Sequence, residues 1–389
     1  MIDWLIVGGG IHGTHLSLAL TRRARVPAAK VRVLDPHARP LAAWDRCVES
    51  VGMPFLRSPD AHHLDLAAPS LHLYADARRA PRVRRFYRPS VELFREHAEA
   101  VIRANELESL RLRGSALAIR RGPRGLLVEC DRGQVSARRV VLAIGGGAPR
   151  WPAWAQALLD DRGDLTRAID HVLAPSYSVA TTMAAARVVV IGGGLSAVQA
   201  AIAASRGRSA PVHLVSRRPV RVADFDPDTC WAGERCLRRL WRLGDPSARR
   251  ALVDGARQRA TVPPDVARQL VLALRRGRVV QTIDEVVRAS PAVDGSIAMT
   301  CTKGQVICSD RVVLATGVDE RRPGPWLDAV AEALSLPVGP RGFPCVDRRL
   351  RWAEGLHVSG VLAELELGPA AGNIVGARLA ARRLLKEAA

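Results

Sequence analysis

Two runs of consecutive apolar residues stand out in the hydrophobic pattern, and a glycine cluster follows each of them. Residues 4–7 (WLIV) precede glycines 8–10, and residues 188–191 (VVVI) precede glycines 192–194. After each cluster, apolar and small residues recur with the spacing of a helix. Uninterrupted apolar runs are typical of strands that are buried on both faces of a parallel sheet. The pattern therefore predicts two strand–turn–helix units, one at the N-terminus and one in the middle of the chain.

Both turns carry the glycine spacing of a dinucleotide-binding fingerprint, Gly-x-Gly-x-x-Gly/Ala. The first glycine makes the tight turn, the second lets a pyrophosphate approach the backbone, and the small third residue lets the helix pack on the strand. The N-terminus of the helix then faces the phosphate charge. Two copies in the same context favour two bound dinucleotides over two ligand-free glycine-rich turns. The residues at these positions are Gly8, Gly10 and Gly13 in the first copy and Gly192, Gly194 and Ala197 in the second.

The residue that ends the following strand differs between the two units. The strand at 30–34 ends in Asp35, a carboxylate that can accept hydrogen bonds from both ribose hydroxyls. The strand at 212–215 is followed by Ser216, Arg217 and Arg218. Guanidinium groups at this place suit a 2′-phosphate, because they offer charge and bidentate hydrogen bonds. We therefore predict FAD in the first unit and NADPH in the second.

Further along the chain, other apolar runs also end in glycine, as expected where strands meet a bound cofactor. Residues 141–144 precede Gly145, residues 312–316 precede Gly317, and a short strand ends at Gly360. These three glycines are predicted to contact the cofactors.

The order of these elements predicts an α/β fold of two Rossmann-like, doubly wound domains. The segment 36–89 is expected to be irregular, and 149–175 to be a linker with one short helix. The strand before Gly360 and the last helix return to the first domain, so the NADPH domain is inserted in a discontinuous FAD domain. The expected limits are 1–170 and 312–389 for the FAD domain and 171–311 for the NADPH domain. Helical patterns cover 90–104, 235–243, 246–258, 264–276 and 371–387.

The loop after Asp35 resembles the FAD-side loop of the N-hydroxylating flavin monooxygenases, the lysine and ornithine N-hydroxylases. That loop carries an aromatic residue, a methionine and a basic residue ahead of the isoalloxazine, and Trp44, Met53 and Arg57 follow this order. The segment 368–378 is similar to the family's last helix, which caps the flavin. The resemblance implies that NADPH reduces FAD and that O₂ then adds to give a C4a-(hydro)peroxyflavin. This species would oxygenate an amine or another soft nucleophile of a small-molecule substrate.

Two residues are candidates for catalytic roles beside this flavin. Arg57 could hold the developing negative charge of the cofactor, or steer nicotinamide or a substrate carboxylate; a surface position is equally open. Asn373 could reach the flavin or nicotinamide, or it could cap the last helix. Trp44 and Met53 are expected to contact the cofactor.

The net charge of +20 changes the list of possible partners. It suits an anionic or carrier-bound substrate or nucleic acid. A general preference of the sequence for arginine explains the charge more simply, so nucleic acid is disfavoured as a partner. No apolar stretch is as long as a membrane span, and the first strand begins too early for a signal peptide. We therefore expect a cytoplasmic protein with no membrane partner.

Seven cysteines are scattered along the chain without a CxxC or CxxxxC pair, and reduced thiols are expected. An alternative function is an NADPH-dependent reductase or oxidase that works without a dithiol and uses Cys47, beside Arg46. No metal is expected, because His62, His63 and Asp65 lack the usual ligand spacing. They are expected instead to line the flavin pocket or to bond the loop backbone.

Overall fold

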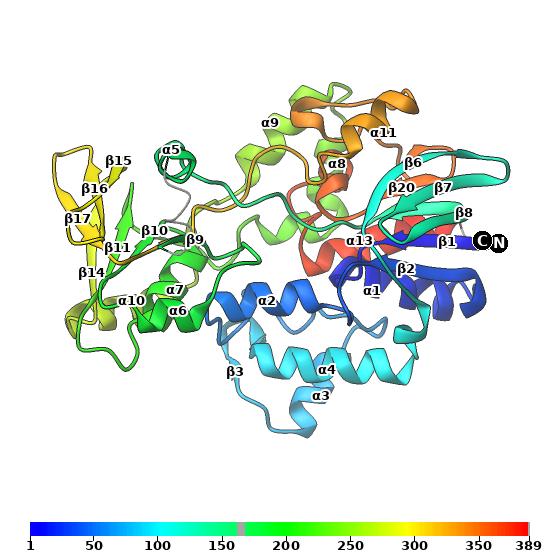
Figure 1. Cartoon of the computed structure of the whole chain (residues 1–389). Helices are drawn as coiled ribbons and strands as arrows, with labels where there is room; N and C mark the ends of the chain where they lie inside the picture. The colour runs from blue at the N-terminus through cyan, green and yellow to red at the C-terminus, as the bar shows by residue number, and fades with distance from the viewer. Residues whose placement is uncertain (162–167, 388–389) are drawn as a thin grey trace.

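The computed structural model describes residues 1–161 and 168–387, and its two large sheets, one mixed and one parallel, lie at opposite ends of the molecule (Figure 1). The first sheet has the order β19-β20-β8-β1-β2-β5, and β1 pairs in parallel with both β2 and β8. An antiparallel hairpin of β6 and β7 continues from β8. The strands are β1 (Ile2–Val7), β2 (Val31–Asp35), β5 (Arg111–Arg113), β6 (Ala116–Gly122), β7 (Gly125–Cys130), β8 (Gly133–Leu142), β19 (Arg351–Ala353) and β20 (Leu356–Val358).

The second sheet has five parallel strands in the order β14-β11-β10-β18-β9. Every residue of β10 and β18 is buried, as their apolar runs predict. Smaller sheets stand beside it: three antiparallel strands, β15 to β17, and the pair β12 and β13. The strands are β9 (Ile169–His171), β10 (Val188–Ile191), β11 (Val212–Ser216), β12 (Arg221–Val222), β13 (Thr261–Val262), β14 (Val279–Ile283), β15 (Val286–Pro291), β16 (Ile297–Cys301), β17 (Val306–Ser309) and β18 (Arg311–Leu314).

The predicted helices are confirmed, and the α/β fold class with them. Ser90 begins the helix expected at 90–104, because its hydroxyl accepts a hydrogen bond from the Leu93 amide. A helix follows each fingerprint, and the last helix ends one turn earlier than expected, since residues 385–387 form a 3₁₀ turn. The helices that the sequence predicts are α1 (Ile11–Leu18), α4 (Val91–Ala104), α7 (Leu195–Ala204), α8 (Glu234–Trp241), α9 (Pro246–Ala256), α10 (Pro264–Arg275) and α13 (Ile374–Leu384). The structure adds α6 (Val179–Ala184) and α11 (Leu327–Ala333).

Two segments hold more regular structure than the sequence pattern predicts. The segment 36–89, expected to be irregular, contains α2 (Ala42–Ser50) and α3 (Ser70–Ala77). The expected linker contains the predicted short helix, α5 (Ala153–Asp161), but also β9, the edge strand of the second sheet; residues 162–167 of this linker lie outside the described residues. The hydrophobic pattern does not predict strand β9, because two of its three residues are polar.

The expected domain limits cut through strands. The limit 170/171 falls inside β9 and the limit 311/312 falls inside β18, yet both strands belong to the second sheet. Between β11 and β14 the chain also returns to the first domain: residues 231–256 supply Trp231, Leu237 and Val253 to the apolar core that contains β1 and β20. We propose limits that keep β9 to β18 in one domain and assign residues 231–256, the helical excursion, to the other.

A buried carboxylate ties this helical excursion to the C-terminal segment. Glu364, in the short helix α12 (Glu364–Leu367), is 4% exposed. It accepts hydrogen bonds from Arg250 (2.9 Å) and from Arg257. Arg257 also donates to Asp226 at 2.8 Å, which extends the cluster to the loop after β12. Three chain segments therefore meet at one buried charge.

The first prediction concerns this cluster. Replacing Glu364 by Gln keeps the shape but removes the buried carboxylate that Arg250 and Arg257 share. Arg250 then keeps only Asp254 and Arg257 only Asp226 as a carboxylate partner, so the loss is expected to cost about 1.5–3 kcal/mol. The midpoint of urea denaturation should fall clearly below that of the wild type. Glu354→Gln is the control: Glu354 is exposed, and its substitution should shift stability by about 0.5 kcal/mol or less. Equal midpoints for the two variants would contradict the role given to Glu364.

Candidate functional site

The first fingerprint turn allows no side chain at two of its glycines. Gly8 has φ +111°, and a Cβ there would lie 2.2 Å from the Ala143 carbonyl oxygen at the end of β8. A Cβ at Gly13 would lie 1.8 Å from the carbonyl oxygen of Gly8. These approaches bring β1, β8 and α1 together at the carboxyl edge of the sheet, where dinucleotides bind in this fold.

Gly10 differs from its two neighbours because its surroundings are open. A Cβ at Gly10 would meet no atom within 4 Å, and Gly10 is the N-cap residue of α1. The first amides of a helix lack intrahelical partners and point outwards from such a cap. The turn thus offers donors and free space where a pyrophosphate is expected, so the residues present fit FAD.

Asp35 lies beside this turn at the end of β2. One carboxylate oxygen accepts from the Gly9 amide at 2.6 Å, and the other accepts from the His37 amide at 2.8 Å. The oxygen bonded to the His37 amide also lies 3.0 Å from Nδ1 of the His37 ring. The oxygen bonded to Gly9 has two lone pairs and retains a free acceptor position for a ribose hydroxyl. The nearest cation is Arg111, 3.7 Å away. The ribose contact itself stays a prediction.

The second fingerprint repeats the geometry of the first. Gly192 has φ +147°, and a Cβ there would lie 2.4 Å from the Ala315 carbonyl oxygen, beside the end of β18. Gly194 is the N-cap residue of α7, as Gly10 is of α1. The third position is Ala197, whose methyl group would lie 3.0 Å from that same Cβ. The two dinucleotide turns are therefore built by the same backbone approach.

Arg217 and Arg218 follow the second site's ribose-side strand, β11. The hydroxyl of Ser216, the last residue of β11, donates to the Arg218 carbonyl oxygen at 3.0 Å and fixes the turn. Both arginines are exposed; the side chain of Arg217 is 69% exposed and stands 3.6 Å from Glu285, which is also exposed. An exposed pair of this kind is weak, so both guanidinium groups are available to a 2′-phosphate.

Three glycines predicted from strand ends have the backbone conformation that favours glycine. Gly145, Gly317 and Gly360 have φ of +84°, +85° and +67°. A Cβ at Gly145 or Gly317 would meet nothing within 4 Å. At Gly360 the closest neighbour is the His12 ring, 3.7 Å away. The space beside the first two is open, as a cofactor contact requires; their contacts with cofactor stay predictions.

His12 was missed by sequence reasoning, because it occupies an unspecified position of the fingerprint. Its Nε2 lies 3.1 Å from the Asn373 carbonyl oxygen and its Nδ1 lies 2.8 Å from the Ser359 hydroxyl. Burial lowers its pKa to about 4, so the ring is neutral at neutral pH. The carbonyl can only accept, which places the proton on Nε2 and makes Nδ1 the acceptor from Ser359. His12 thus fastens the start of α1 to the start of α13.

Trp44 and Asn373 were both predicted to lie beside the flavin, and the structure shows their contacts within the protein. Trp44, in α2, packs on Phe94 with ring centroids 4.9 Å apart. Asn373 is the N-cap residue of α13, but its side chain makes no capping hydrogen bond. Asn373 therefore occupies the cap position, but its side chain does not cap the helix. The other role considered, a contact with flavin or nicotinamide, stays a prediction.

Met53 and Arg57 lie at the contact between the two domains. Met53 packs against the apolar cores of both. Arg57 donates to the carbonyl oxygens of Asp224 and Ala223, both at 2.9 Å, and to the Thr261 hydroxyl at 2.8 Å. All three partners belong to the segment around β12 and β13. The predicted catalytic role of Arg57 is untested, but its guanidinium is already occupied by bonds across the domain contact.

Two more arginines of the segment 36–89 reach the second domain. Arg88 is 3% exposed and donates to Asp265 at 2.6 Å, and Arg85 donates to Asp224 at 2.6 Å. Together with Arg57 they form what we call the arginine clamp. The clamp holds the two dinucleotide-binding domains against each other.

His63 bonds the backbone of the flavin-side loop, one of the two roles expected for His62, His63 and Asp65. His63 Nε2 lies 2.9 Å from the Ala68 carbonyl oxygen, and burial lowers the pKa of His63 to about 4. Arg378 of α13 donates to the Asp65 carbonyl oxygen at 2.9 Å. These bonds fix the conformation of the loop between Arg57 and α3.

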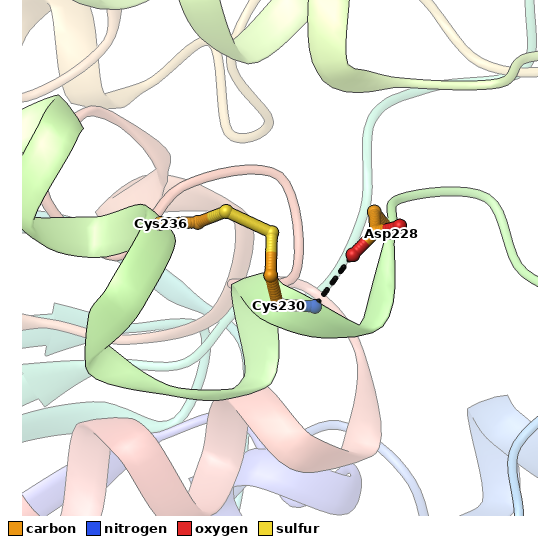
Figure 2. Close-up of a disulfide and its surroundings, with 3 residues drawn as sticks. All are labelled: Asp228, Cys230 and Cys236. Atoms are coloured by element: carbon orange, nitrogen blue, oxygen red, sulfur yellow. Dashed lines mark hydrogen bonds between the residues drawn. A yellow bond between two sulfur atoms is a disulfide. The ribbon is translucent and has the colours of Figure 1, made fainter.

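The expectation that all cysteines are reduced thiols is wrong for two of them. Cys230 and Cys236 form a disulfide, with Cα atoms 5.6 Å apart (Figure 2). Asp228 accepts from the Cys230 amide at 2.8 Å and begins the 3₁₀ turn that carries Cys230. Gly233 then reverses the chain into α8, which brings Cys236 back. Five intervening residues match neither dithiol motif sought in the sequence, so spacing alone does not reveal this pair.

A family model for pyridine nucleotide-disulphide oxidoreductases matches residues 2–239, more than half of the chain. The chain belongs to this family. Members of this pyridine nucleotide-disulphide oxidoreductase family bind FAD and NAD(P)H. Family membership therefore confirms the two predicted cofactor classes. The match spans both fingerprints. A comparison with curated protein sequences gave no match.

Solved structures confirm the resemblance in fold to the N-hydroxylating monooxygenases. L-lysine 6-monooxygenase from Pseudomonas syringae is similar with a TM-score of 0.73 and 20% identity, over 100% of this chain and 99% of that one. The cadaverine monooxygenase DfoA from Erwinia amylovora, solved with FAD, gives 0.75 and 15%, over 100% and 94%. A flavin-containing monooxygenase from Stenotrophomonas maltophilia gives 0.62 and 22%, over 100% and 98%. At these identities the likeness establishes the two-domain flavoprotein fold.

Across residues 1–161 and 168–387, no helix combines the length and the apolar character that crossing a membrane requires.

The second prediction tests the FAD site at Gly10. Its φ of −74° suits any residue and its surroundings are open, so Gly10→Val should fold normally. The valine side chain would occupy the pyrophosphate space, and the purified variant should contain little flavin by absorbance. Gly255→Val is the control, because Gly255 is also unobstructed and lies in α9. Full flavin content in Gly10→Val would exclude this site.

Proposed function

We propose that this protein is an NADPH-dependent flavin monooxygenase that oxygenates an amine or another soft nucleophile of a small molecule, with O₂ as co-substrate. The observation that carries the proposal is the pair of matching dinucleotide turns with different ribose-side residues, Asp35 in one and Arg217-Arg218 in the other. The likeness in fold to lysine and cadaverine monooxygenases over the full chain supports it.

The protein's own residues would bind and orient the cofactors. The open turn at Gly10 would receive the FAD pyrophosphate, and Asp35 the ribose. Bound FAD supplies hydride acceptance from NADPH and the reaction with O₂. Neutral His12 would fix the start of α13 beside the flavin without adding charge. The arginine clamp would keep the two cofactor sites together and limit the access of water to their contact.

The alternative route through Cys47 is disfavoured by the surroundings of this thiol. Burial raises the pKa of Cys47, and the charge of Arg46 offsets this only in part. A reactive cysteine needs the opposite shift, towards thiolate at neutral pH. A structural role in α2 fits Cys47 better.

A second candidate function rests on Cys230–Cys236. If this disulfide accepts electrons from NADPH through the flavin, two electrons and two protons convert it into two thiols, and the protein is a reductase. Anaerobic addition of NADPH followed by thiol titration of the native protein separates the two functions. A monooxygenase should show no new thiols, whereas a reductase should show two per chain.

The third prediction concerns the reaction with O₂. With aliphatic primary amines, lysine and cadaverine included, the enzyme should consume NADPH and O₂ in equal amounts and release a hydroxylated product, with little hydrogen peroxide. Oxygen electrode and mass spectrometry measure these quantities. Slow NADPH oxidation in air together with rapid transfer to a disulfide substrate would overturn the proposal in favour of the reductase.

The fourth prediction concerns the preference for NADPH over NADH. Removing both arginines by Arg217→Ala/Arg218→Ala should raise KM for NADPH roughly tenfold to a hundredfold and leave KM for NADH nearly unchanged, because only NADPH carries the 2′-phosphate. Arg275→Ala/Arg276→Ala, an exposed neighbouring pair in the same domain, removes equal charge and should have little effect. Comparison at low and high salt separates direct contact from long-range attraction. An unchanged preference would mean that the 2′-phosphate is read elsewhere.

A further inference from the structure

A hollow in the surface of the molecule lies away from both dinucleotide turns. It has a volume of about 420 Å³, within the range of small-molecule sites, and three chain segments line it. These are α8, the loop before β19 and the last turn of α13. We call it the arginine pocket; its lining residues are Glu234, Arg238, Trp241, Arg242, Arg348 and Arg383.

The four arginines of this pocket form no close ion pair in the described part of the chain. Within residues 1–161 and 168–387, none of the four is within 4.0 Å of a carboxylate, although Glu234 lies at the same wall. The arginines of the neighbouring helix α9 behave differently: Arg249 and Arg250 are both bonded to carboxylates of α12. The carboxyl group of Glu366, on which the charges of Arg348 and Arg383 also act, is already bonded to Arg249. The concave space therefore carries an excess of positive charge, which attracts anions.

Trp241 holds two of these arginines in place. The guanidinium carbon of Arg348 lies 4.4 Å from the centroid of the indole and that of Arg383 lies 4.7 Å from it. The indole is itself fixed, because its N–H donates to the Glu366 carbonyl oxygen at 2.9 Å. Cation–π contacts thus restrict two long side chains before any ligand arrives, and less entropy is lost on binding.

The pocket is separate from the two cofactor sites. Asn373, at the start of α13, is fastened to the first fingerprint through His12, whereas Arg383 lies ten residues further on, about 15 Å along the helix. Figure 1 also shows α8 well apart from β10 and β11, which carry the second fingerprint. A ligand here would therefore add to FAD and NADPH rather than replace either.

We propose that the arginine pocket binds a small molecule that carries two or more phosphate or carboxylate groups. Guanidinium forks match both groups by bidentate hydrogen bonds. Two observations favour more than one such group: four arginines line the same hollow, and its volume exceeds what one phosphate fills. This inference concerns binding and is independent of the reaction at the flavin.

The fifth prediction is tested on the holoprotein, saturated with FAD and NADP⁺ so that both fingerprints are occupied. Isothermal titration at about 0.15 M salt should detect one binding site for pyrophosphate or for citrate. Arg348→Gln should weaken that binding roughly tenfold or more, as expected for one lost charge-assisted contact. Arg238→Gln provides a second variant on an exposed part of α8, for the case in which Arg348→Gln unfolds.

The matched control is Arg239→Gln. Arg239 is the next residue of α8, is exposed and does not line the pocket. Its loss should leave the affinity unchanged. Comparison of the affinities for pyrophosphate and citrate shows whether the pocket prefers phosphate or carboxylate ligands. The proposal fails if neither anion binds, if acetate binds equally well, or if Arg239→Gln weakens binding as much as Arg348→Gln.

Discussion

The buried carboxylate of Glu364 is the interaction on which the arrangement of this protein depends. A buried charge is tolerated only when all its partners are in place, and the partners of Glu364 come from a distant part of the chain. This contact joins the C-terminal segment to the helical excursion, whose Trp231, Leu237 and Val253 pack into the apolar core of the first domain. As a result, α12 and α13 are covered, and α8 becomes a wall of the arginine pocket. The buried ion pair and the apolar packing thus act together to place the helical excursion on the first domain.

A steric constraint of the backbone acts twice in the same way. At Gly8 and at Gly192 the chain passes so close to a carbonyl oxygen of a neighbouring strand's end that no side chain fits. The two turns therefore have nearly the same shape although the ribose-side residues differ. Specificity for one nucleotide or the other is left to residues outside the turn, where substitution is free of this constraint.

Much of the fold was predictable because its signals are local. The apolar runs of β1 and β10, the glycine spacing and the cap at Ser90 each lie within a few residues of the structure that they specify. Strand β9 was not predictable, because Asp170 is buried against Arg311, a residue 141 positions away. His12 and the Cys230–Cys236 disulfide were missed for related reasons. The role of His12 depends on partners more than 340 positions away, and the disulfide depends on a chain reversal at Gly233.

The arginine clamp has a consequence for how this interface would look in a set of related sequences. Arg57 bonds mainly to backbone carbonyls, which every residue type supplies. The partner segment is therefore free to change its side chains without losing these bonds, whereas Arg57 cannot become lysine and keep several donors in a fixed plane. We expect Arg57 to be retained while its contact residues drift. A search for correlated substitutions would then find the side-chain pairs of Arg85 and Arg88 but pass over the bonds of Arg57.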